Sequence, residues 1–207
     1  MRSPRLVALA LLAAAPLAAQ APRAGRPEGW RWRYDRANAV DSTLEFVTMS
    51  PGWHITTGPA AILYHPSHTA RGNFRVDSRI FLFPPGEHAE GFGLFLGGRN
   101  LEGADQSYTY FLVRKDGRFM IKQRTGATTR DVVPWTANDA VTPHPGGTSD
   151  VRNDLAVDVA ADSVRFLVNN RQVHAAQRSA IPTDGQVGLR INHALNLHVS
   201  RLEITPR

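Results

Sequence analysis

The sequence predicts an all-β protein that folds as a two-sheet antiparallel jelly-roll sandwich. From Trp30 onward, short segments alternate apolar and polar residues with a period of two, the pattern of strands with one buried face. Turn-forming pairs such as Asp116-Gly117 and Asn169-Asn170 separate these segments,. No segment shows a sustained helical period. A dozen or so short strands without helices between them are typical of a sandwich or a barrel.

The expected strands follow one another with short gaps. They lie near residues 44–48, 52–56, 59–64, 73–83, 91–99, 107–115, 118–124, 129–135, 151–160, 163–169, 171–176, 186–192 and 194–205.

The first residues have the pattern of a secretory signal peptide. Arg2 and Arg5 precede an apolar run at 6–19, and small residues follow it,. The run is shorter than the roughly 20 apolar residues that span a bilayer, and a buried N-terminal helix is the alternative. We therefore expect a signal peptide at 1–19, a flexible lead-in at 20–29 and one β-sandwich domain at 30–207, with a periplasmic or secreted location and no membrane anchor,.

Composition narrows the function classes. The chain has no cysteine, so it has no disulfide to hold it in an oxidising compartment,. Its formal net charge is +6, but arginines alternate with acidic residues along the expected strands instead of forming clusters. Nucleic-acid binders concentrate their positive charge, so no nucleic-acid partner is expected.

Two hairpins can be registered from the sequence. A two-residue turn at Asp116-Gly117, sets Leu112 opposite Ile121 on the core face and Phe111 opposite Lys122 on the outer face. A turn at 161–162 sets Val157 opposite Phe166, inside the core.

The next turn and the closing strands can be registered in the same way. The turn at 169–170 brings Val173 opposite Phe166. In the last strand, Leu202 and Ile204 break the inward parity, which predicts a bulge near Ser200-Arg201,.

Several segments resemble the 3-keto-disaccharide hydrolase family, over about residues 50–205. They are residues 90–99 (EGFGLFLGGR), 108–118 (YTYFLVRKDGR), 153–173 (from NDL through VNNRQV), 184–190 (DGQVGLR) and 195–199 (LNLHV). That family belongs to the concanavalin A-like lectin and glucanase superfamily. The resemblance implies a jelly-roll fold and activity on a keto-sugar glycoside.

Acidic residues offer one candidate for catalysis. Glycosidases need two carboxylates at a set separation, but the Glu-x-Asp-x-x-Glu strand of the sandwich glucanases is absent. Asp77 lies midway along a long expected strand, between Arg75 and Arg79. These neighbours would keep Asp77 ionised, as suits a base or an acceptor for a substrate hydroxyl. The alternative is a surface ion-pair stripe.

Histidines give no metal site. His65 and His68 have plausible ligand spacing, but no third ligand can be assigned, and zinc usually has three or four. No pattern predicts a metal or a cofactor.

Glycines line one face of the strand at 91–99. With Phe92, Leu94 and Leu96 inward, the outward positions are Gly91, Gly93, Phe95, Gly97 and Arg99. Glycines weaken a strand and need a reason. Close approach of a flat ligand is one reason, and tight twisting of a crowded sandwich is the other.

Aromatic and cationic side chains are expected beside these glycines. Aromatic faces and arginine forks are common in sugar sites, although a plain solvated sheet is an equal alternative. The residues predicted to bind a carbohydrate or glycoside are Phe95, Arg99, Phe111, Lys122 and Arg124.

Three functions remain open. The first is an extracytoplasmic carbohydrate-active domain that resembles the 3-keto-disaccharide hydrolases. The second is a non-catalytic glycan- or surface-binding module, and the third is a structural envelope component.

Overall fold

The structure is a computed structural model that describes residues 27–36 and 44–207. The expected signal peptide and most of the lead-in lie outside these residues. Within them, no helix has the length and apolar character needed to cross a membrane.

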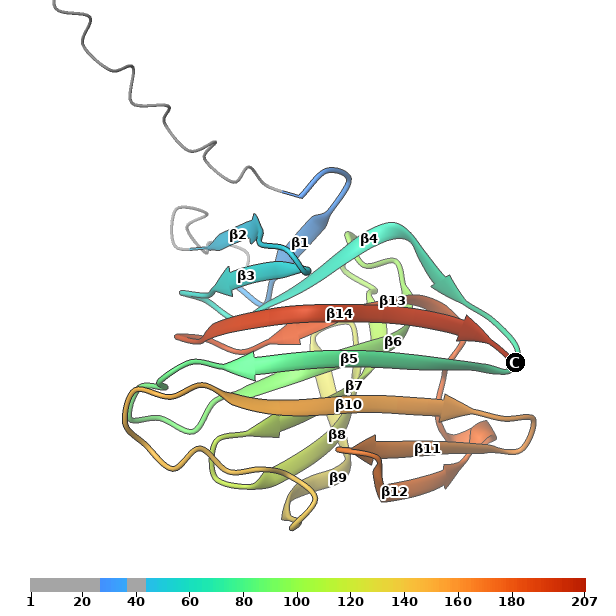
Figure 1. The fold of residues 1–207 in the computed structure, drawn as a ribbon. Coiled ribbons are helices and arrows are strands. Elements are labelled where there is room, and N and C mark those ends of the chain that lie inside the picture. Colours follow the sequence, from blue (N-terminus) through green and yellow to red (C-terminus); the bar gives the residue numbers. More distant parts are fainter. Residues whose placement is uncertain (1–26, 37–43) are drawn as a thin grey trace, which may run out of the picture.

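Two antiparallel sheets of seven strands each face one another, which confirms the predicted sandwich (Figure 1). Sheet A has the order β1 (Arg31–Tyr34), β4 (Ala61–Ala70), β13 (Gly185–Ile191), β6 (Gly91–Arg99), β7 (Ser107–Arg114), β8 (Arg118–Thr125) and β9 (Thr128–Ala137). Sheet B has the order β12 (Arg171–Gln177), β11 (Ser163–Val168), β10 (Val151–Val159), β5 (Phe74–Leu82), β14 (Asn196–Pro206), β3 (Trp53–Thr56) and β2 (Glu45–Thr48). A short 3-10 turn, Arg178–Ala180, follows β12.

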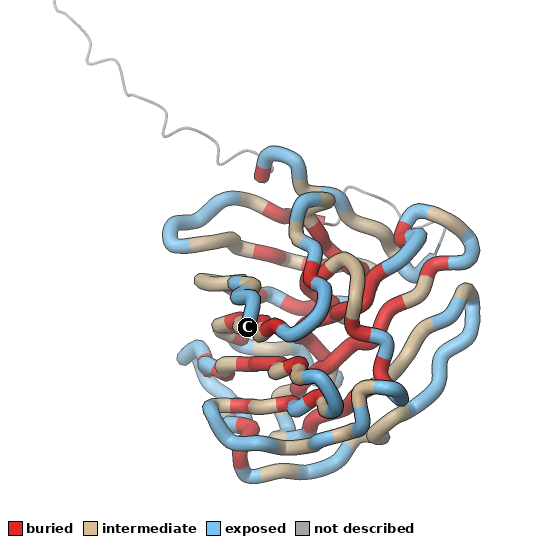
Figure 2. Tube along the Cα trace, turned by 90° about the vertical axis from the view of Figure 1, so that its right-hand side faces the viewer, coloured by how far each residue is buried: buried red, intermediate tan, exposed pale blue. Residues whose placement is uncertain are grey.

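The main core lies between the sheets, where the buried residues gather in Figure 2. Phe166 of β11 is fully buried, and its ring centroid lies 5.3 Å from that of Phe111 on β7. Sheet A also carries a second buried cluster on its outer face, the face turned away from sheet B. Its members are Ile62, Tyr64, Phe95, Leu101, Tyr108, Tyr110, Leu112 and Met120. Sheet A is therefore apolar on both faces, which explains the near-continuous apolar runs of β6 and β7.

The β10–β11 hairpin has the predicted register, with Val157 opposite Phe166. Asn169 and Asn170 make the next turn with positive φ values of 50° and 65°, as asparagine tolerates. The β11–β12 pairing differs from the prediction. A bulge after Phe166 brings His174, not Val173, opposite it, because the extra residue of a bulge shifts the register by one.

The last strand contains the expected irregularity. The β5–β14 register shifts between Val199 and Arg201. Leu202 and Ile204 then pack against the main core as partly buried residues, which confirms the predicted bulge near Ser200 and Arg201.

The β7–β8 register is one residue away from the predicted one. The turn has three residues, 115–117, and Arg114 pairs with Arg118. Gly117 has a positive φ of 77°, as expected for the left-handed residue of a three-residue hairpin loop. Phe111 therefore pairs with Ile121, and Leu112 with Met120. The one-residue slip exchanges the two faces of the strand, so Phe111 points into the core and Leu112 points outward.

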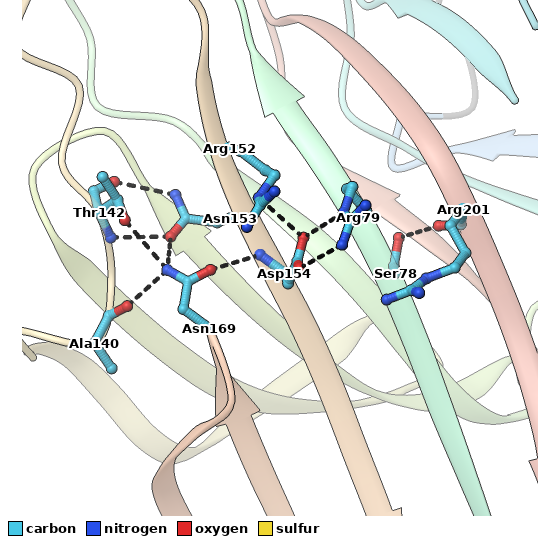
Figure 3. A network of polar contacts seen from close by, with 9 residues as sticks. All are labelled: Ser78, Arg79, Ala140, Thr142, Arg152, Asn153, Asp154, Asn169 and Arg201. Carbon is cyan, nitrogen blue, oxygen red and sulfur yellow. Dashed lines mark hydrogen bonds and ion pairs between the residues drawn. The ribbon is translucent and has the colours of Figure 1, made fainter. Parts of the chain in front are cut away.

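Asparagine side chains fix the loop before β10 (Figure 3). Asn169 donates from Nδ2 to the carbonyl of Ala140 at 2.9 Å and accepts at Oδ1 from the backbone N–H of Asp154 at 2.8 Å. Asn153 is 2% exposed and makes two bonds, of 2.9 and 3.0 Å, with the backbone of Thr142. This network holds the loop at 138–142 against sheet B and satisfies buried polar groups that would otherwise be costly.

Candidate functional site

The structure places the five residues predicted to bind a ligand in three different locations. Phe95, Lys122 and Arg124 share the outer face of sheet A. Arg99 lies at the end of β6 and is exposed. Phe111 is fully buried in the main core, so its predicted outward orientation is wrong. Tyr110 occupies the position opposite Lys122 that was expected for Phe111, and Tyr108 lies opposite Arg124.

Asp77 lies apart from this group, on β5 of the other sheet. Its carboxylate accepts two hydrogen bonds of 2.8 Å from Arg75. Arg75 also donates to Asp158 of the neighbouring β10 at 2.8 Å. The contacts of Asp77 are those of the ion-pair stripe that the sequence offered as the alternative.

Protein atoms fill the spaces beside the glycines of β6. A Cβ at Gly93 would lie 2.2 Å from the carbonyl oxygen of Phe111, and one at Gly91 would lie 2.9 Å from the ring of Trp135. The ring of Phe95 lies over Gly98 and Gly188. A Cβ at Gly98 would lie 2.9 Å from this ring, and one at Gly188 would lie 2.6 Å from it. Crowding within the sheet, the second reason considered above, accounts for the glycines at 91, 93 and 98.

A polar cluster lies on the outer face of sheet A, around the buried side chain of Arg190. We call it the Asp35 cluster, and it consists of Asp35, Tyr108, Tyr110, Arg124 and Arg190. Arg190 of β13 donates from both Nη atoms to the Asp35 carboxylate, at 2.8 and 2.6 Å. Its guanidinium lies 5.6 Å from the ring centroid of Tyr110. Arg124 approaches the same carboxylate at 3.5 Å.

Burial and charge shift the pKa values in this cluster. Burial alone would lower the pKa of Arg190, but the Asp35 carboxylate and the two tyrosines more than offset it, so this pKa is raised. Burial raises the pKa of Tyr110 to about 12, although Arg190 opposes the shift. The tyrosines are therefore neutral and the arginine charged at neutral pH. The Nε atoms of Arg124 and Arg190 are buried without hydrogen-bond partners.

An open groove lies at one end of sheet A, beside the loop at 100–106. It consists of two adjoining pockets of about 610 and about 400 Å³ that share Asn100 and Gln186. The larger pocket is lined by Thr69, Arg71, Gly98, Arg99, Asn100, Asp184, Gly185 and Gln186. The smaller is lined by Arg31, Tyr64, Asn100, Leu101, Glu102, Gly103, Asp105 and Gln186. We call this surface the sheet A groove; Arg99 is the one predicted site residue that lines it.

The loop at 100–106 forms a fixed wall of the groove. Arg33 of β1 donates to the carbonyls of Leu101 and Gly103 at 2.7 and 2.5 Å. Asn100 donates from Nδ2 to Asp105 at 2.7 Å. Leu101 packs in the outer-face cluster. These contacts give the groove a preformed shape, as is usual for ligand sites.

The carboxylates of the groove all have partners. Glu102 pairs with Arg31 and accepts from the Tyr64 hydroxyl at 3.3 Å. The hydrogen bond from Arg31, followed by its charge, lowers the pKa of Glu102. Asp184 accepts from Arg178 at 3.0 Å, and Asp105 accepts from Asn100. Arginine, amide and hydroxyl groups are thus left to face a ligand.

Two histidines of β4, His65 and His68, lie close together. The rings of His65 and His68 are 5.1 Å apart between centroids, and burial, with a smaller contribution from His65, lowers the pKa of His68. Within residues 27–36 and 44–207, no group of three or more histidine or carboxylate side chains is placed to hold a metal ion.

Sequence alone indicated little of this surface. Strand parity predicts that Arg99 faces outward with Phe95, but a register shift between Leu96 and Arg99 breaks that alternation. The Asp35–Arg190 pair joins residues 155 positions apart and left no local signal. Asp184 and Gln186 lie in a segment that resembles the 3-keto-disaccharide hydrolases, and that resemblance assigned neither residue to a site.

The fold is similar to several solved structures. A carbohydrate-binding module, CBM66 from Bacillus subtilis, has a TM-score of 0.61 at 12% identity, over 84% of this chain and 94% of that one. A β-glucanase from Bacillus licheniformis has a TM-score of 0.59 at 10% identity, over 88% and 95%. A Bacillus subtilis protein of unknown function with a galectin-like fold has a TM-score of 0.56 at 10% identity, over 86% and 89%.

These likenesses show that the chain shares the two-sheet jelly-roll sandwich fold of these proteins. No protein-family model matches the sequence, and no curated protein matches it.

Proposed function

We propose that this protein binds a saccharide in the sheet A groove and does not transform it. The groove itself carries the proposal, because guanidinium, amide and hydroxyl groups converge there on a wall that is already fixed. Sugar hydroxyls both donate and accept hydrogen bonds, and a few convergent polar groups are what orient such ligands. The similar folds include one named as a carbohydrate-binding module and one named as a glucanase.

The state of the groove carboxylates favours binding over catalysis. Glycoside hydrolysis needs one carboxyl group that is held protonated by a raised pKa and a second carboxylate beside the scissile bond. The pKa of Glu102 is lowered, and Asp105 and Asp184 already accept hydrogen bonds. Hydrolysis of a keto-sugar glycoside, which the family resemblance implies, stays a prediction without support from this groove.

Calorimetric titration against a panel of neutral and charged oligosaccharides and oxidised disaccharides tests the function. We expect saturable binding without new reducing ends or released sugars. Gln186→Ala should weaken binding about threefold to tenfold, because it removes a neutral hydrogen bond. Gln172→Ala, on exposed β12 of sheet B, is the matched control and should change nothing. Turnover of any panel member would overturn the non-catalytic assignment, and absence of all binding would overturn the function.

We also propose that the chain is exported and works in the periplasm or outside the cell. The basic start, short apolar run and small-residue exit within residues 1–21 support this proposal,. Intact-mass analysis of protein from the periplasm or the medium should give a chain that begins at Gln20 or Pro22. A chain that retains Met1 would contradict it.

A further inference from the structure

Two arginines of the larger pocket have no carboxylate partner. Arg71, in the turn after β4, makes no ion pair or hydrogen bond among the described residues. Arg99 donates only from Nε, to the backbone carbonyl of Asp184 at 3.4 Å, which leaves its Nη atoms free. Both side chains are exposed, yet both line one pocket of about 610 Å³.

The remaining charges of this pocket do not neutralise them. Among the described residues, Asp184 is the one carboxylate that lines the pocket, and it is paired with Arg178 at 3.0 Å. Because the Asp184–Arg178 pair has no net charge, the unpaired Arg71 and Arg99 give the pocket a net positive charge. Most arginines on the outer face of sheet B differ, since Arg75, Arg79 and Arg152 all lie within 4 Å of a carboxylate.

Glycines line the same pocket beside the two arginines. Gly185 begins β13, which lies between β4 and β6, and both Gly98 and Gly185 line the pocket. A Cβ at Gly185 would lie 2.5 Å from the carbonyl oxygen of Gly98, so crowding within the sheet explains the glycine. Neither glycine adds a negative charge to the pocket that holds the two guanidinium groups.

We propose that the sheet A groove selects acidic saccharides, and that Arg71 and Arg99 together bind the carboxylate or sulfate group of the sugar. The inference rests on the proposed saccharide-binding function and adds the ligand class. Guanidinium forks match the two oxygens of a carboxylate or sulfate. The neutral hydroxyls of the same sugar would be bound by Gln186 and Asn100 on the wall that the two pockets share.

Calorimetry with matched sugars tests the inference. The first pair is oligomannuronate and a manno-oligosaccharide of equal length, which differ in the carboxylate. The second pair is a galactan oligosaccharide with and without sulfate. We expect wild type to prefer the acidic member of at least one pair by about tenfold to a hundredfold, the range of one charge-assisted hydrogen bond. Raising the salt concentration should weaken only the acidic ligand.

Variants then locate the anion. Arg71→Gln and Arg99→Gln should each remove most of the preference, and Arg99→Lys should restore only part, because lysine keeps the charge but loses the fork. Arg165→Gln is the matched control, since Arg165 is exposed on β11 of sheet B. Thermal unfolding should be unchanged in all four variants. If one fails to fold, the preference of wild type and its salt dependence still decide.

Each outcome has a distinct meaning. Equal binding of neutral and acidic sugars, or an acidic preference that survives both glutamine variants, overturns this inference and leaves the proposed function intact. Absence of binding to every sugar overturns the proposed function as well. A preference for the acidic member in the carboxylate pair alone, or in the sulfate pair alone, identifies the anion that the groove binds.

Discussion

The outer faces of the two sheets hold their ion pairs in different surroundings. On sheet A, Arg190 has only 6% of its side chain exposed and meets the Asp35 carboxylate, which is 29% exposed, beside the ring of Tyr110. On sheet B, Arg75 and Asp77 are 20% and 19% exposed and form part of a ladder along the surface. Water therefore reaches the guanidinium of Arg75 more than that of Arg190. An arginine–aspartate pair is therefore expected to contribute more to the free energy of unfolding on sheet A than on sheet B.

Removal of one partner tests this difference most strongly at the Asp35 cluster. Asp35→Ala leaves the buried Arg190 without its carboxylate, and we expect a loss of about 3–5 kcal/mol in the free energy of unfolding. Asp131→Ala is the control, because Asp131 pairs with Lys122 at 2.8 Å on the same sheet but is 48% exposed. Denaturant titration measures both. Equal losses would mean that burial does not distinguish the two pairs.

The neutral network of sheet B should give the next largest effect. Asn169→Ala removes the bonds to Ala140 and Asp154, and we expect a loss of about 1–3 kcal/mol, the cost of buried groups left unpaired. Asn170→Ala is a close control, because its φ of 65° resembles the 50° of Asn169 and carries the same backbone cost. A difference of less than about 0.5 kcal/mol between the variants would show that the network adds little.

A pH titration tests whether the Tyr110 hydroxyl on the outer face of sheet A is shielded from water. The pKa of Tyr110 is about 12 in the folded protein and about 10 in an unfolded chain. Above pH 10 the unfolded state loses this proton first, so stability should fall as pH rises, by about 1 kcal/mol per pH unit. Tyr110→Phe should flatten the slope of unfolding free energy between pH 10 and 11. An unchanged slope would contradict the raised pKa.

The ladder of sheet B should give the smallest effect. Asp77→Ala breaks a partly exposed pair, and we expect a loss below about 1 kcal/mol that shrinks further in high salt. Saccharide binding should be unaffected, because Asp77 and the groove are on different sheets. Loss of saccharide binding, or of any turnover, in this variant would identify Asp77 as a functional residue. It would contradict the assignment of Asp77 to a surface ion-pair stripe.

Two hairpins show how far the sequence could predict the fold. In β10–β11, the three inward pairs are all apolar, Leu155 with Val168, Val157 with Phe166 and Val159 with Val164. The outward positions include Asp158 and Arg165, so only one register buries the apolar set,. In β7–β8, both faces of β7 are apolar because both are buried. Either register then satisfies the pattern, and the turn decides. A three-residue loop ending in Gly117 replaced the expected two-residue turn, and Phe111 went into the core.

The site was less predictable than the fold for a related reason. Strand parity could not place Arg99, because the register of β6 shifts between Leu96 and Arg99. Arg71, Gln186 and Asn100 come from different strand ends, and only the order β4–β13–β6 within sheet A brings them together. The Asp35–Arg190 pair depends on the same long-range order. A sequence pattern with a period of two reports which side a residue faces, but not which distant strand lies beside it.

The position of β14 bears on the order in which the molecule can form. Residues 196–206 lie between β5 and β3 in the middle of sheet B. While the ribosome is still making the chain, β5 and β3 each present an open edge for lack of this last strand, and open edges invite pairing with other chains. Sheet B cannot be completed before residues 196–206 have been made. A chain with this topology is therefore expected to depend on being kept unfolded until β14 has been synthesised.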